Sequence, residues 1–166
     1  MRNTKDWLYQ FSYRFVAGLV ALGLFGLSSL FEIRTEYTIL ARAVSYEVNM
    51  KGTNILASAI NPTDFVGDPI LINHDSGSVT NVQGHIIDAM RTHSGFLIKA
   101  VLLPSRDISD MLDKGLITDV SVGFVGSLIG NEWIWVDPHE VSLVSIGADR
   151  NAKILKIDKK YRIMLK

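Results

Sequence analysis

The chain has 166 residues, enough for one domain with a hydrophobic core and a short additional segment. Its 17 basic residues balance 17 acidic residues, so it lacks the basic surplus expected of a nucleic-acid-binding protein. The absence of cysteine excludes disulfide bonds and a thiolate nucleophile, and the four histidines show no metal-ligand spacing, so we expect neither a metal nor a cofactor.

The first 35 residues differ in character from the rest of the chain. Arg2, Lys5 and Arg14 precede an uncharged run, residues 15–31, whose apolar side chains surround the helical wheel. A helix that is apolar on all sides must be buried in protein or in lipid, and about 17–25 residues suffice to span a membrane. Residues 1–35 are therefore predicted to form a hydrophobic helix that is either membrane-associated or docked on the domain or on a partner.

Residues 36–156 are predicted to form one domain built mainly from strands. One amphipathic helix begins after Pro104-Ser105 and ends at Gly115. A last short strand from Ile154 leads into a basic C-terminal tail, residues 157–166. Many short strands with one or two helices predict an α+β fold that is mainly β, arranged as a small, mainly antiparallel barrel or sandwich. The segments rich in β-branched and aromatic residues, and therefore predicted as strands, are 37–46, 55–60, 69–74, 82–89, 96–103, 117–128, 133–136 and 141–146.

Alternation along two of these strands places polar residues away from the core. Ser121 and Gly123 lie on the face opposite Val120, whose apolar side chain belongs to the core. Gly123 has no side chain, so we expect it to line a groove where a substrate backbone approaches. On the later strand, Glu140 points to the face opposite to that of its neighbour Val141, so its carboxylate can share the face of Ser121.

These residues, together with His74, form a candidate nucleophilic site. A serine hydroxyl is a weak nucleophile until a base accepts its proton, and His74 follows an apolar strand where it could do so. A carboxylate hydrogen-bonded to the other ring nitrogen would hold the imidazole in the required tautomer, and Glu140 is the candidate for this role. A solvated serine such as Ser121, a structural histidine and an edge glutamate are the simpler alternatives, and spacing alone leaves them open.

Three segments together resemble the prohead serine proteases of tailed bacteriophages, whose fold is related to the herpesvirus assembly protease. The histidine motif of that family, an apolar strand ending in Asn-His-Asp, is matched by Leu71-Ile-Asn-His-Asp-Ser76. Its serine motif, a glycine-ended helix followed by a Val-Ser-Ile-Gly-Phe type of strand, is matched by residues 112–124. Its third motif is matched by Glu140-Val-Ser-Leu-Val144, and the resemblance covers roughly residues 37–154.

The resemblance implies a small antiparallel β-barrel of the herpesvirus-protease type, with a serine endopeptidase site. It implies Ser121 as nucleophile, His74 as general base and Glu140 as orienting acid, without cofactor or metal. His139 is a reserve for the third position, because the herpesvirus relatives use a second histidine there, and Asp137 is another. The implied reaction is cleavage of a scaffold, or of the scaffold-like part of a capsid protein, through an acyl-enzyme during procapsid maturation.

The resemblance also implies partners and a location. The substrates would be the scaffold and the major capsid protein, met in the procapsid interior or in the host cytoplasm, with homodimer formation and membrane contact through residues 15–31 left open. Two other functions stay open. One is a catalytically silent β-domain that binds scaffold or capsid protein. The other is a membrane-tethered β-domain unrelated to capsids, which would face outward because the basic residues ahead of the apolar run favour a cytoplasmic N-terminus.

Overall fold

The computed structural model describes residues 31–165, so the hydrophobic helix expected in residues 1–35 lies almost wholly outside the described residues. Where the two overlap, the expectation is corrected, because the first strand, β1, already begins at Phe31. The chain divides into two compact units, residues 1–34 with 161–166, and residues 35–160, and the second unit holds the candidate site. Within the described range, no helix has the length and apolar character needed to cross a membrane.

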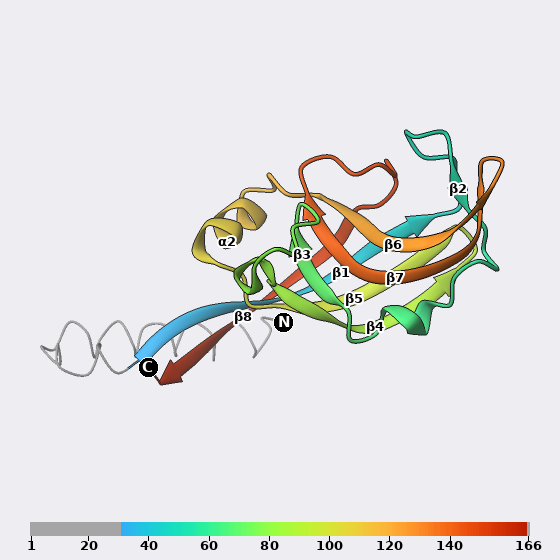
Figure 1. Ribbon diagram of the computed structural model, residues 1–166. Coiled ribbons are helices and arrows are strands. Elements are labelled where there is room, and N and C mark those ends of the chain that lie inside the picture. Colours follow the sequence, from blue (N-terminus) through green and yellow to red (C-terminus); the bar gives the residue numbers. More distant parts are fainter. Residues whose placement is uncertain (1–30, 166) are drawn as a thin grey trace, which may run out of the picture. The chain divides into compact units, whose positions relative to one another are not determined.

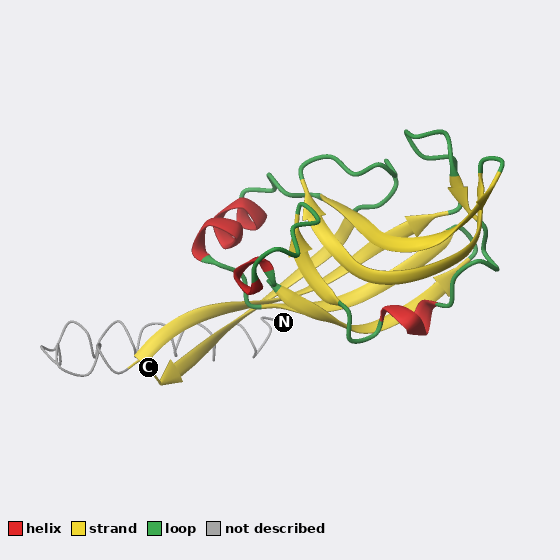
Figure 2. Ribbon diagram, in the orientation of Figure 1, coloured by secondary structure: helices red, strands yellow, loops and turns green. Residues whose placement is uncertain are grey.

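The described part of the chain is mainly β-strand with one α-helix and two short 3-10 helices, which confirms the predicted dominance of strands (Figure 2). The helices are η1 (Pro62–Phe65), η2 (Val79–Asn81) and α2 (Arg106–Asp113). The strands are β1 (Phe31–Ser45), β2 (Asn54–Ile55), β3 (Pro69–Ile72), β4 (Gly84–Thr92), β5 (Gly95–Leu102), β6 (Asp119–Ile129), β7 (Glu132–Val144) and β8 (Ile154–Leu165).

The helix α2 lies where the sequence predicts it. The Ser105 hydroxyl caps its start by accepting a hydrogen bond from the Ile108 N–H at 3.5 Å. Gly115 follows its end with a φ of 65°, the left-handed conformation that favours glycine after a helix. The Tyr37 hydroxyl of β1 donates to the Asp113 carboxylate at 2.9 Å, so the last turn of α2 is tied to the sheet.

All strands belong to one mixed sheet, in the order β2-β7-β3-β4-β5-β1-β8, with β6 also paired to β7. β6 and β7 form a long antiparallel hairpin, and β3 lies beside β7 (Figure 1). Both β3 and β2 are parallel to β7, whereas the pairs β1–β5, β3–β4, β4–β5 and β6–β7 are antiparallel, in line with the expected mainly antiparallel arrangement. Parallel neighbours need a long crossover connection, and the segment from β4 through β6 supplies one between β3 and β7.

The sheet of residues 35–160 curls into a half-barrel, and the segment just before β8 bridges its open side. The Val120 N–H donates to the Ala152 carbonyl at 3.1 Å, and Asp119 forms a β-bridge with Lys153. On the other side of this segment the Arg42 N–H of β1 donates to the Lys153 carbonyl at 2.9 Å. The start of β6 is therefore held by β7 on one edge and by this segment on the other.

The core lies on the concave side of the sheet and contains the apolar face that alternation predicts. Val120 and Val141 are fully buried, as expected from the alternating pattern in their strands. The other large side chains that are fully buried are Tyr37, Ile39, Phe65, Ile70, Ile86, Phe96, Ile98, Leu102 and Leu143.

β7 is one continuous strand, whereas the sequence predicts two strands, 133–136 and 141–146. Pro138 lies between them, and proline cannot donate a backbone hydrogen bond to a neighbouring strand. In the structure Pro138 is paired with Phe124 beside a register shift between Gly123 and Phe124. A β-bulge at this point accommodates the missing donor, so the strand continues through the proline.

Two further predicted elements differ in length. The strand expected at 55–60 is reduced to Asn54–Ile55, because the chain turns where the Ala59 N–H donates to the Leu56 carbonyl. The basic tail expected at 157–166 is strand as far as Leu165, because β8 is paired with β1.

Asp119 anchors the start of β6 to the loop that follows β7. Its carboxylate accepts hydrogen bonds from the Gly147 N–H at 3.2 Å, from the Thr118 hydroxyl at 2.8 Å and from the Lys153 ammonium at 2.5 Å. Burial by itself raises the pKa of Asp119, but the hydrogen bonds from Lys153, Gly147 and Thr118 outweigh it and hold the pKa below its ordinary value of 3.8. The folded chain therefore binds this proton less readily than the unfolded chain, so the stabilisation is complete above that ordinary value and is lost as the pH falls through the lowered pKa.

We expect Asp119→Asn to lower the free energy of unfolding by about 1–3 kcal/mol at neutral pH, because Lys153 and the Gly147 N–H lose a charged acceptor. Because the variant has no carboxylate to protonate here, its stability should also fall less steeply in acid. Urea unfolding at about pH 7 and about pH 3 measures both effects. Asp88→Asn, at an exposed position of β4, is the matched control. Parallel stability-against-pH curves for the wild type and Asp119→Asn would contradict the assignment.

Candidate active site

The register of the β6–β7 hairpin brings four polar or small residues onto one face. Ser121 is paired with Ser142, and Gly123 is paired with Glu140. Residues directly opposite each other in an antiparallel pair point to the same side of the sheet. All four therefore face away from the buried side chain of Val120, as alternation predicts for Ser121, Gly123 and Glu140.

His74 reaches the same place from β3, on the edge of β7 opposite to β6. β3 ends at Ile72, and a tight turn follows in which the Asp75 N–H donates to the Ile72 carbonyl at 3.0 Å. The two central residues, Asn73 and His74, have φ values of 52° and 60°. Asparagine and histidine are among the few non-glycine residues that adopt this left-handed conformation with some frequency, so the local sequence suits the turn.

The three side chains proposed from the sequence form a continuous chain of hydrogen bonds. His74 Nδ1 lies 2.5 Å from Glu140 Oε1, and His74 Nε2 lies 2.9 Å from Ser121 Oγ. An ionised carboxylate only accepts hydrogen bonds, so the proton of a neutral imidazole lies on Nδ1 and leaves Nε2 to accept the Ser121 O–H. The Glu140 side chain is 10% exposed, whereas the His74 side chain is 43% exposed, so the acid is enclosed and the base faces solvent.

This geometry is the one that activates a serine. A base within hydrogen-bond reach of the hydroxyl can take its proton as the oxygen attacks an electrophile. A carboxylate on the second ring nitrogen holds the imidazole in the required tautomer and stabilises the imidazolium that forms.

Ser142, for which the sequence suggested no role, contacts two members of this group. Its hydroxyl donates to Glu140 Oε2 at 2.7 Å and accepts the His74 N–H at 2.8 Å. The signal that could have found it is local, because Ser142 follows Glu140 by two residues and therefore shares its strand face.

Gly123 makes room for the Glu140 carboxylate, a role that the sequence did not suggest. A Cβ atom built on Gly123 would overlap Glu140 Oε1 and would lie 2.8 Å from Glu140 Cδ. Atoms at that separation repel each other, so any side chain at this position would displace the carboxylate from His74 Nδ1.

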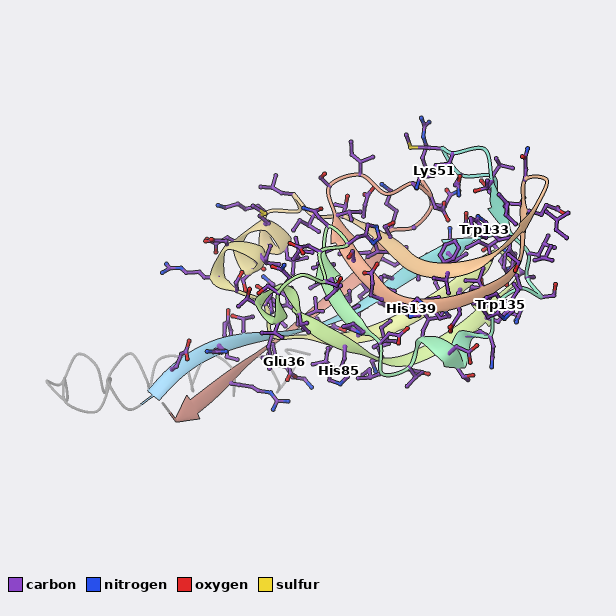
Figure 3. The ribbon with its side chains drawn as sticks, viewed as in Figure 1. Glu36, Lys51, His85, Trp133, Trp135 and His139 are labelled. Carbon is purple, nitrogen blue, oxygen red and sulfur yellow. The ribbon has the colours of Figure 1, made fainter. Side chains whose placement is uncertain are left out.

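The two reserve residues, His139 and Asp137, lie elsewhere. Both are exposed on β7, and His139 is labelled there in Figure 3. Within residues 31–165 neither makes a hydrogen bond or ion pair with His74, and no cluster of acidic and histidine side chains there is suited to a metal ion. Instead they influence Asp68: burial raises the pKa of Asp68, His139 opposes that rise, and Asp137 and Glu140 add to it.

A small cavity of about 60 Å³ opens beside Ser121. It lies between β6, the end of β1 and the loops that follow β1 and β7, and both apolar and polar residues line it, the polar ones including Glu47, Asn49, Asn54 and Asp149. The apolar residues that line it include Ala43, Val44, Ile55, Val122, Phe124 and Ala148.

No protein-family model matches the chain, and no curated protein matches it. Among solved structures, the varicella-zoster virus protease matches with a TM-score of 0.49 and 16% identity, over 75% of this chain and 64% of that chain. The KSHV protease in complex with a hexapeptide phosphonate inhibitor matches with a TM-score of 0.47 and 12% identity, over 78% of this chain and 66% of that chain. The chain thus spans slightly less than two thirds of each viral protease, and at such low identity we transfer no residue role from them.

Proposed function

We propose that this chain is a serine peptidase in which Ser121 is the nucleophile, His74 the general base and Glu140 the orienting acid. The observation that supports this most directly is the unbroken hydrogen-bond chain from Ser121 Oγ through both nitrogens of His74 to Glu140. Both ring nitrogens are engaged, one with a carboxylate and the other with a hydroxyl, and the imidazole lies on a solvent-facing side where an electrophile can approach.

The reaction would proceed through an acyl-enzyme. Ser121 Oγ attacks the peptide carbonyl carbon while its proton moves to His74 Nε2, and the same proton is then donated to the leaving amine as the C–N bond breaks. Water next attacks the ester carbonyl with His74 again as base, which releases the acid and restores the hydroxyl. Glu140 accepts the Nδ1–H throughout and stabilises the imidazolium by its charge.

The substrate side chain next to the cleaved bond would enter the cavity beside Ser121. Its small volume favours a small side chain over a long one, and its mixed lining includes the carboxylates Glu47 and Asp149 beside apolar residues.

The finer proposal concerns the substrate. The resemblance of the His74, Ser121 and Glu140 motifs to prohead proteases supports an endopeptidase that removes scaffold protein, or the scaffold-like part of a capsid protein, during procapsid maturation. The reaction would then take place inside the procapsid or in the host cytoplasm. Incubation with procapsids that contain uncleaved scaffold tests it: cleavage by the wild type but not by Ser121→Ala is expected. Intact scaffold in both samples would remove the capsid assignment.

A fluorophosphonate probe tests the catalytic proposal without knowledge of the substrate. It should label the folded wild-type chain, with the adduct located on Ser121 by mass spectrometry, because an activated serine reacts with phosphorus as it does with a carbonyl. Ser127→Ala, at an exposed position of the same strand, should be labelled normally, and heat-denatured wild type should not be labelled. A folded wild-type chain that stays unlabelled would contradict the proposal and favour a catalytically silent binding domain.

A further inference from the structure

Ser142 occupies the centre of the candidate site although it faces no solvent. It lies in β7 between two partners, Ser121 of β6 on one edge and Leu71 of β3 on the other. Its exposed fraction is 0%, so it cannot meet a substrate directly. Any contribution it makes must pass through the groups that its hydroxyl contacts.

The Ser142 hydroxyl uses its only proton and one lone pair on two different members of the site. The proton is donated to Glu140 Oε2, and the lone pair accepts the backbone N–H of His74. Because Oε2 is engaged in this way, Oε1 is left to face His74 Nδ1. One hydroxyl therefore sets both the rotation of the carboxylate and the position of the backbone that carries the imidazole.

The backbone at His74 is a place where such a contact matters. Asn73 and His74 are both left-handed, a conformation that non-glycine residues keep only when their surroundings hold it. Two hydrogen bonds join this turn to β7. The Asn73 N–H donates to the Leu143 carbonyl at 3.1 Å, and the His74 N–H donates to Ser142 Oγ. Of these two, only the second depends on a side chain.

We propose that Ser142 is a positioning residue that couples the His74 backbone to the Glu140 carboxylate and so keeps Nε2 aimed at Ser121. Its effect on catalysis rests on the proposed peptidase function, whereas the coupling itself does not. Without the hydroxyl, the enclosed oxygen Oε2 loses its donor, which favours rotation of the carboxylate toward solvent and away from Nδ1.

The labelling kinetics of Ser142→Ala test the catalytic consequence. We expect the maximal rate of fluorophosphonate labelling, kinact, to fall about 10²-fold with KI unchanged, because a displaced base slows the chemical step and leaves probe binding intact. Ser142→Thr, which keeps the hydroxyl, should recover most of this rate, and Ser127→Ala is the matched control. Unchanged kinact in Ser142→Ala, or equal losses in the alanine and threonine variants, would overturn the inference.

Proton NMR tests the coupling without any activity. In the Ser121→Ala background, the short contact with Glu140 should shift the His74 Nδ1 proton far downfield. Adding Ser142→Ala should move this signal upfield or abolish it, and adding Ser142→Thr should preserve it. If Ser142→Ala does not fold, Ser142→Cys takes its place, because a thiol has similar size but is a weak donor.

The two experiments separate failure of this inference from failure of the proposed function. If no probe labels the wild-type chain but its Nδ1 signal depends on the Ser142 hydroxyl, the positioning role is supported and the proposed peptidase function is contradicted. If the chain is labelled at Ser121 but Ser142→Ala leaves the Nδ1 signal unchanged, the proposed peptidase function is supported and the positioning role is overturned.

Discussion

Replacement of His74 by alanine should slow fluorophosphonate labelling of Ser121 by at least about 10³-fold. Nε2 of His74 is the base that contacts the Ser121 hydroxyl, at 2.9 Å, and without it the proton must leave to water. The measurement is the pseudo-first-order rate of labelling at a fixed probe concentration, followed by mass spectrometry of the intact chain. His74 is on an exposed turn, so the variant should fold, which circular dichroism can check.

The control for this prediction is His85→Ala. His85 is exposed on β4 and is paired with Pro69, at the opposite end of β3 from the turn that carries His74. Its replacement should leave the labelling rate within about twofold of the wild type. Equal rates for His74→Ala and the wild type would remove the general base from the mechanism, even if Ser121 carried the label.

Glu140→Gln should lower the labelling rate by about 10³–10⁴-fold while the chain stays folded. A side-chain amide can present its NH₂ group to His74 Nδ1, and the imidazole would then carry its proton on Nε2. In that tautomer His74 can no longer accept the proton of Ser121, the effect known from amide replacements of the acid in catalytic triads. The same kinetic assay measures this loss, and Glu132→Gln, exposed at the start of β7, is the matched control.

Gly123→Ala provides an independent check on the role of Glu140. Its Cβ atom would overlap Glu140 Oε1, so the carboxylate must leave His74 Nδ1 although all three proposed catalytic residues are still present. The labelling rate should therefore fall in the same direction as in Glu140→Gln. A fully active Gly123→Ala, or a Glu140→Gln variant as fast as the wild type, would show that the Glu140–His74 contact does not contribute.

Local pattern was enough to identify the strands and the face on which the polar residues lie. The side-chain period of a strand is two, so Ser121, Gly123 and Glu140 had to leave the core if Val120 and Val141 entered it. The same local chemistry marked the helix α2, because a serine cap and a terminal glycine act within one turn. These predictions needed no knowledge of which strands are neighbours.

Local pattern could not identify what the small residues in this region do. The sequence did not indicate that the space beside the Cα atom of Gly123 holds the Glu140 carboxylate. Ser142 had no expected role, and its hydroxyl lies between His74 and Glu140. For Gly123 the outcome depends on which residue is paired across the β6–β7 hairpin, and a β-bulge next to Gly123 shifts that register by one residue. For Ser142 the contact with His74 depends on β3 lying beside β7.

The amino-acid sequence was thus sufficient to predict that the run from Asp119 to Phe124 is a strand whose serine points away from the core. The assembly of the site depended on the packing of distant segments. His74 is 47 residues from Ser121 and 66 residues from Glu140, and they meet only because β3 lies parallel to β7. Such a pairing is stabilised by contacts over the whole sheet, including the buried Ile70 and Leu143, and short-range preferences do not encode it.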